Sequence, residues 1–147
     1  MKNYYKSLFE HEHWANLKVL ESFIALPNPP QRVMQLFSHI IAAQRIWLDR
    51  ITGKQTQVTP WEEFSTEIML ELLEINYVEI LKLIENEDFE QLIHYTNSKG
   101  NAFINTISQI FTHLTLHASY HRGQIVSLIK PQVENLPITD YIFYVRN

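Results

Sequence analysis

Apolar residues recur at intervals of three and four along four separate stretches of the chain. These stretches cover residues 4–25, 31–52, 66–86 and 102–129. This spacing is typical of amphipathic helices, because a helix has about 3.6 residues per turn and buries one face. The 147 residues include only 3 glycines, too few for the many tight turns of an all-β fold. We therefore predict one all-α domain over residues 1–147, a four-helix bundle.

Turn-forming residues separate the predicted helices. Pro29 and Pro30 end the first helix, since proline cannot continue one. Gly53 is a suitable left-handed stop for the second helix. Residues 59–62 have the spacing of a capping box with proline in its first turn, so we expect a short helical turn there.

The stretch of residues 89–101 lacks the helical period. Residues 92–96 favour a strand, and residues 97–100 are typical of a turn. We expect a small hairpin or an extended excursion before the last long helix. After that helix, residues 141–145 are too apolar for a free tail. We expect this C-terminal segment to be capped by Asp140 and to pack on the bundle.

Composition excludes several classes of function. The formal net charge is -4 and the 12 lysines and arginines are scattered, so nucleic acid is not an expected partner. No apolar run approaches the roughly 18 residues of a membrane span, and the N-terminus does not resemble a signal peptide. The chain has no cysteine, which excludes disulfides, thiolate ligands and a cysteine nucleophile. We expect a cytoplasmic protein with no membrane partner.

Three of the seven histidines lie in the last predicted helix at intervals of four residues: His113, His117 and His121. They span about 80° of the helix surface, so they share a face. Residues four apart are about 6 Å apart along the axis and can share one metal ion. His113 and His121, about 12 Å apart, cannot. The metal pair is therefore either His113 with His117 or His117 with His121.

A third ligand must come from another helix, and His39 in the second helix is the best candidate. Neutral imidazole binds zinc, nickel, copper and iron. Three histidines with one open position are typical of a catalytic metal site. The alternative is that these histidines only make ordinary hydrogen bonds, because this spacing is common on helices. The residues between His117 and His121 include no carboxylate, so the motif is not that of the metalloproteases.

The segment His117-Ala118-Ser119-Tyr120-His121-Arg122-Gly123-Gln124-Ile125 resembles the signature of the DinB family. Weaker similarities lie around residues 37–48, 95–107 and 139–146. The resemblance implies a four-helix bundle with up-down-down-up connections, often a homodimer. It also implies a divalent ion, usually zinc or nickel, held by one histidine of the second helix and two of the last. Carried over to this chain, the ligands are His39, His117 and His121.

The resemblance implies a function as well. Family members with known activity mainly use a low-molecular-weight thiol as a cosubstrate. We therefore expect a metal-dependent S-transferase acting on a small molecule. Metal-dependent hydrolysis is a variant. The alternative is a stress-related bundle protein without enzymatic activity, whose metal is structural or absent. An open fourth position at the metal would favour an enzyme, and a sealed one a structural role.

Roles are also expected for the neighbours of the histidines. Gln124 is placed to orient a ligating ring or a water molecule. Arg122 either pairs with Asp140, holding the C-terminal segment over the site, or is exposed. Gly123 suggests either close approach of a neighbouring group or access to the site. His113 is either a hydrogen-bonded core residue or a group beside the ligands that supports them or transfers protons.

Overall fold

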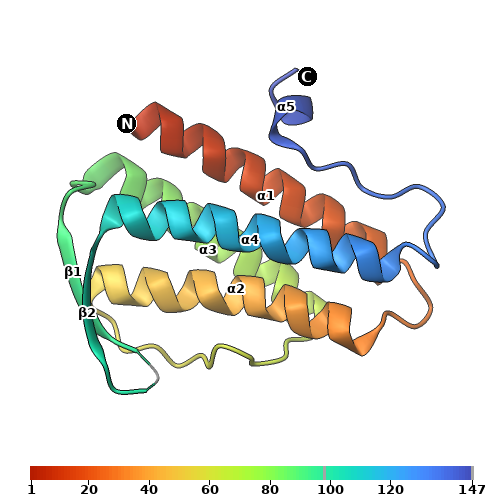
Figure 1. Ribbon diagram of the computed structural model, residues 1–147, viewed down its shortest axis with the longest axis horizontal. Helices are drawn as coiled ribbons and strands as arrows, with labels where there is room; N and C mark the ends of the chain where they lie inside the picture. The colour runs from red at the N-terminus through yellow and green to blue at the C-terminus, as the bar shows by residue number, and fades with distance from the viewer. Residues whose placement is uncertain (98, 147) are drawn as a thin grey trace.

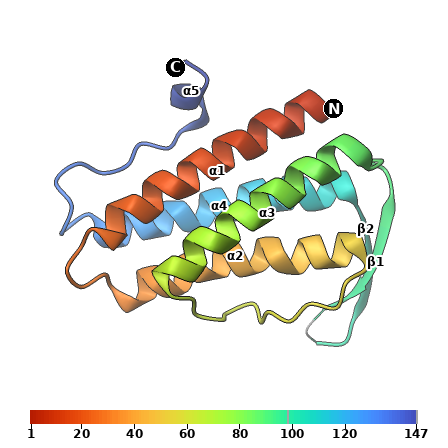
Figure 2. The same cartoon turned by 180° about the vertical axis from the view of Figure 1, so that it is seen from behind.

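The computed structural model describes residues 1–97 and 99–146. Its four long helices are α1 (Lys2–Ile24), α2 (Gln31–Thr52), α3 (Thr66–Asn86) and α4 (Ile107–Ile129). They pack side by side as a bundle, which confirms the all-α prediction (Figure 1). α1 and α4 run in one direction, and α2 and α3 run in the opposite direction (Figures 1 and 2). α4 packs against both α1 and α2.

The connection between α2 and α3, residues 53–65, runs along the bundle because these two helices are parallel (Figure 2). α2 ends as predicted at Gly53, whose φ of 69° is left-handed. The predicted helical turn at residues 59–62 is a hydrogen-bonded turn that begins no helix. There the Glu62 carboxylate accepts a 3.0 Å bond from the N–H of Thr59. α3 starts only after Ser65, whose hydroxyl accepts from the N–H of Ile68.

The expected hairpin is present, formed by β1 (Leu92–Thr96) and β2 (Ala102–Thr106). The strands are antiparallel, with Leu92 opposite Thr106 and Thr96 opposite Ala102. The prediction that the last helix begins at residue 102 is therefore wrong, because residues 102–106 pair with β1. α4 begins where Thr106 and Gln109 form a capping box, each side chain accepting from the other's N–H.

The core consists of two apolar clusters. The cluster at the hairpin end includes Phe9, Leu48, Ile84 and Phe111. The other includes Phe23, Phe37, Met69 and Ile125. In α1, α2 and α3, buried polar residues lie between the residues of the two apolar clusters. They are Glu12, Asn16, Gln44 and Asn76. The core thus has a polar layer where the apolar period of each helix is interrupted.

Some apolar residues of the long helices are exposed. Ile68 is 41% exposed and Leu128 is 40% exposed. Their neighbours Met69 and Ile129 are fully buried instead. One residue along a helix turns a side chain by about 100°, which places Ile68 and Leu128 at the solvent side of their buried neighbours. None of the helices within the described ranges has the length and apolar character of a membrane span.

The C-terminal segment packs on α1, as predicted. The hydroxyl groups of Ser7 and Tyr141 are 2.9 Å apart, and the ring of Trp14 lies 5.3 Å from that of Tyr144. This segment includes α5 (Tyr141–Tyr144), which lies beside α1 on the side away from α2 (Figure 1).

Candidate metal centre

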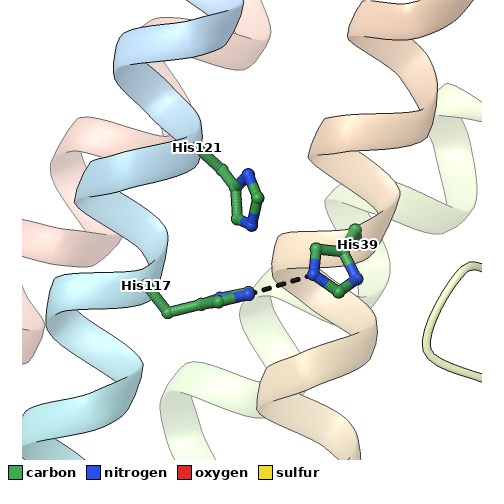
Figure 3. Close-up of side chains that lie close together, drawn as sticks. All are labelled: His39, His117 and His121. Carbon is green, nitrogen blue, oxygen red and sulfur yellow. Dashed lines mark hydrogen bonds between the residues drawn. The ribbon is translucent and has the colours of Figure 1, made fainter.

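The three predicted ligand histidines meet at the seam between α2 and α4. His39 comes from the middle of α2, and His117 and His121 come from successive turns of α4 (Figure 3). One ring nitrogen from each lies within 4.8 Å of the other two. His117 follows His39 by 78 positions in the chain. The antiparallel packing of the two helices therefore creates this cluster.

The His39 ring is held by the connection between α2 and α3. Its Nδ1 lies 2.6 Å from the carbonyl oxygen of Pro60, and the indole of Trp61 stacks on it at 3.9 Å. A carbonyl oxygen only accepts hydrogen bonds, so Nδ1 of His39 carries the proton. In the neutral ring, Nε2 then has a free lone pair. That Nε2 lies 3.0 Å from Nε2 of His117.

The His121 ring is held in the same way from within α4. Its Nδ1 donates to Oε1 of Gln124 at 2.7 Å, so its Nε2 has the lone pair. Gln124 thus orients the ring, as expected from the sequence. Metal-binding histidines almost always donate their second ring N–H to an acceptor of this kind.

Burial favours the neutral form of the His117 and His39 imidazoles. It lowers the pKa of His117 to about 3, and the neighbouring histidines act in the same direction. The pKa of His39 is also lowered by burial, although the hydrogen bond to Pro60 opposes this shift. A histidine must be deprotonated to bind a metal. At neutral pH these two rings are in that state.

The cluster fits a divalent metal ion. Nitrogen ligands about 2.0–2.1 Å from a tetrahedral zinc ion are ~3.3 Å from one another. The 3.0 Å separation between His39 and His117 is close to this value. No carboxylate of the described residues joins the three histidines. The group could therefore hold an ion with three protein ligands and leave a position open.

His113 does not join the cluster, which resolves the choice that spacing left open. Its ring centroid is 5.3 Å from that of His117 and 5.7 Å from that of Trp47. It is exposed and lines a separate cavity with Trp47, Tyr95 and Gln109. His113 is therefore outside the three-histidine group and is not a core residue.

Both expectations for Arg122 are wrong. Its side chain is only 4% exposed, and its Nη1 donates to Oδ1 of Asn16 on α1 at 2.9 Å. Among the described residues it forms no ion pair with Asp140. The reason is angular: Arg122 follows His121 by one residue, so it points about 100° away, toward α1. Burial raises the pKa of Glu12 to about 7, against the attraction of Arg122.

The expectation that a neighbouring group approaches Gly123 closely is also wrong. Among the described residues, no neighbouring heavy atom lies within 4 Å of the place where a Cβ would stand. The residue instead lines an open groove with Tyr120, Gln124 and Arg32.

Sequence reasoning missed Pro60 and Trp61 as contributors to the site. One feature of the sequence could have indicated Trp61, since it is a large aromatic residue in an otherwise polar connection. The carbonyl group of Pro60 had none, because every residue carries one.

Comparison with known proteins agrees with the sequence signature. The whole chain, residues 1–147, matches the sequence model of the DinB family. A curated relative, Protein DinB of Bacillus subtilis (strain 168), is 25% identical over an alignment covering 98% of this chain and 95% of the relative. No solved structure matches the chain at a significant level.

Proposed function

The chain belongs to the DinB family, and on that premise we propose that it is a metal-dependent S-transferase. It would transfer a low-molecular-weight thiol to a small electrophilic molecule. The proposed ligands of the ion, zinc or nickel, are His39, His117 and His121. The observation that carries the proposal is the set of ring orientations. Two of the three rings donate outward through Nδ1, which leaves Nε2 for the centre.

A divalent ion at this place would supply Lewis acidity, which lowers the pKa of a thiol in its open position. The chain has no cysteine, so the sulfur must arrive with a cosubstrate. The thiol loses its proton to solvent, and a sulfur lone pair forms the bond to the electrophilic carbon. The leaving group departs with the electron pair of its former bond to that carbon.

The protein contributes position rather than acid–base chemistry. Pro60 and Trp61 fix the His39 ring, and Gln124 fixes the His121 ring. No carboxylate from the described residues lies in the ligand group, so we assign no general base. His117 is only half-buried, which leaves the centre accessible to a small molecule. This access, with three protein ligands rather than four, supports an enzyme over a structural metal site.

The test is a thiol screen on protein reloaded with zinc or nickel. Bacillithiol, glutathione and other small thiols would each be combined with a chromogenic electrophile such as chlorodinitrobenzene. We expect metal-dependent turnover with at least one thiol and its loss in His121→Ala, with little change in melting temperature. Turnover of ester or amide substrates without a thiol would indicate a hydrolase instead. A large fall in melting temperature on metal removal, with no turnover, would indicate a structural ion.

We also propose that the protein is a homodimer, as the family resemblance implies. Light scattering at several protein concentrations would test this, and a constant mass of one chain would contradict it.

A further inference from the structure

A groove of about 570 Å³ lies directly beside the histidine cluster. This volume is in the range of small-molecule sites, which are typically about 300–1,000 Å³. The groove follows the α2–α4 seam toward the start of α2. Its lining residues are Arg32, Leu36, Tyr120, Gly123, Gln124, Ser127 and Leu128.

Two of the lining residues also contact the proposed ligands. Gln124 bonds to His121, and the Tyr120 ring lies 5.1 Å from the His121 ring. On the α2 side, the Arg32 guanidinium lies 5.2 Å from the ring of Trp61, which stacks on His39. The groove therefore adjoins the side chains that contact the histidine cluster.

Gly123 contributes open space to this groove. It lies inside α4, where glycine is unfavourable by about 1 kcal/mol relative to alanine. Its backbone needs no left-handed φ, and no neighbour from the described part of the chain approaches the Cβ position. Neither backbone geometry nor packing therefore requires a glycine here. What the missing side chain leaves is room in the groove.

Arg32 is the only charged residue among the described residues that line the groove. It donates to Oε1 of Gln35 at 3.4 Å and forms no ion pair within residues 1–97 and 99–146. It lies in the first turn of α2, which contains no acidic residue. The positive end of the helix dipole therefore adds to the charge of the guanidinium.

From these observations we infer that the groove binds the anionic end of the thiol cosubstrate, with Arg32 pairing to a carboxylate. Gly123 leaves the room that this part of the molecule occupies. Arg32 precedes His39 by seven residues, about 10 Å along the helix axis. The thiol and the carboxylate must therefore be separated by several bonds. This inference rests on the proposed function, because it requires sulfur at the metal centre.

The test uses cobalt-loaded protein and two probes of equal length, mercaptohexanoate and mercaptohexanol. Binding of sulfur to cobalt is read from the thiolate-to-metal charge-transfer absorption, without any turnover. We expect the carboxylate probe to bind about tenfold or more tightly than the alcohol, as a charge-assisted hydrogen bond provides. Arg32→Gln should remove this preference and leave the alcohol's affinity unchanged.

The second part of the test fills the groove with a larger side chain. Gly123→Leu should weaken both probes about tenfold or more without reducing cobalt content or melting temperature. Arg146→Gln and Ser119→Leu are the matched controls, because both residues are exposed and neither lines the groove. They should leave both affinities unchanged.

The outcomes separate this inference from the proposed function. Equal affinities for the two probes in the wild-type protein, or an unchanged preference in Arg32→Gln, would overturn the inference while thiol binding stands. Cobalt-loaded protein that shows no charge-transfer band with either probe would overturn the thiol function itself, and the inference with it.

Discussion

Nε2 of His117 on α4 lies 3.0 Å from Nε2 of His39 on α2. The proton on Nδ1 of His39 leaves its Nε2 as an acceptor, so the two rings share a single proton between them. A divalent ion would replace that proton and use both lone pairs. The Pro60 carbonyl oxygen and Oε1 of Gln124, which accept from the His39 and His121 rings, therefore belong to the proposed metal centre together with the three histidines.

Removal of the Gln124 side chain tests this point. In Gln124→Ala, the His121 ring loses its acceptor, and zinc affinity should fall about 10–100-fold. Gln124→Glu keeps an acceptor and should restore the affinity. Competition with a chelator of known affinity measures both. Equal zinc affinities in wild type and Gln124→Ala would show that the bond to His121 does not matter for metal binding.

Trp61 allows a separate test of the connection between α2 and α3. Trp61→Ala removes the ring stacked on His39, so the imidazole gains freedom that metal binding must remove. We expect weaker zinc binding but a melting temperature within a few degrees of wild type, since the indole is 52% exposed. The reverse pattern, a large loss of stability with unchanged zinc affinity, would assign Trp61 to the fold.

The sequence was sufficient for the helical period and for naming the three histidines that the fold brings together. Spacing alone made His113 and His121 equally suitable as the partner of His117 at a metal ion. The resemblance to the DinB family was needed to choose between them. Helix α4 was placed too early because residues 102–106 are apolar enough for either structure. Their pairing with β1 decides the matter, and such pairing is a tertiary effect. The burial of Arg122 could not be predicted for the same reason, because it depends on α1 packing against the side of α4 from which Arg122 projects.

Two glycines should respond to alanine in opposite directions. Gly123→Ala should stabilise the protein by about 1 kcal/mol, because the site is helical and open. Gly53→Ala should destabilise it by about 1–2 kcal/mol, because an alanine at a left-handed φ of 69° is strained. Urea unfolding measures both. A destabilised Gly123→Ala variant would contradict the open environment described for this residue.

The buried carboxyl group of Glu12 should make stability depend on pH. Its pKa rises from 4.5 to about 7 on folding, so the native state binds more protons between these values. This group's contribution is therefore full below pH 4.5 and is lost as pH rises through 7. The loss amounts to about 3 kcal/mol.

The measurement is urea unfolding of metal-free wild type and Glu12→Gln at pH 5 and pH 8. Glutamine does not titrate, so the difference between the two proteins isolates Glu12 from the histidines. We expect the wild type to lose stability relative to the variant as pH rises. A difference that stays constant over this range would mean that Glu12 is ionised throughout, paired with the charge of Arg122.

The most direct measurement of the central claim is zinc stoichiometry in four single variants beside the wild type. Elemental analysis of reloaded, desalted protein should give one ion per chain in the wild type and in His113→Ala. His39→Ala, His117→Ala and His121→Ala should each lose the ion while remaining helical by circular dichroism. A wild type that binds no zinc or nickel, or a loss confined to His113→Ala, would contradict the three-histidine centre.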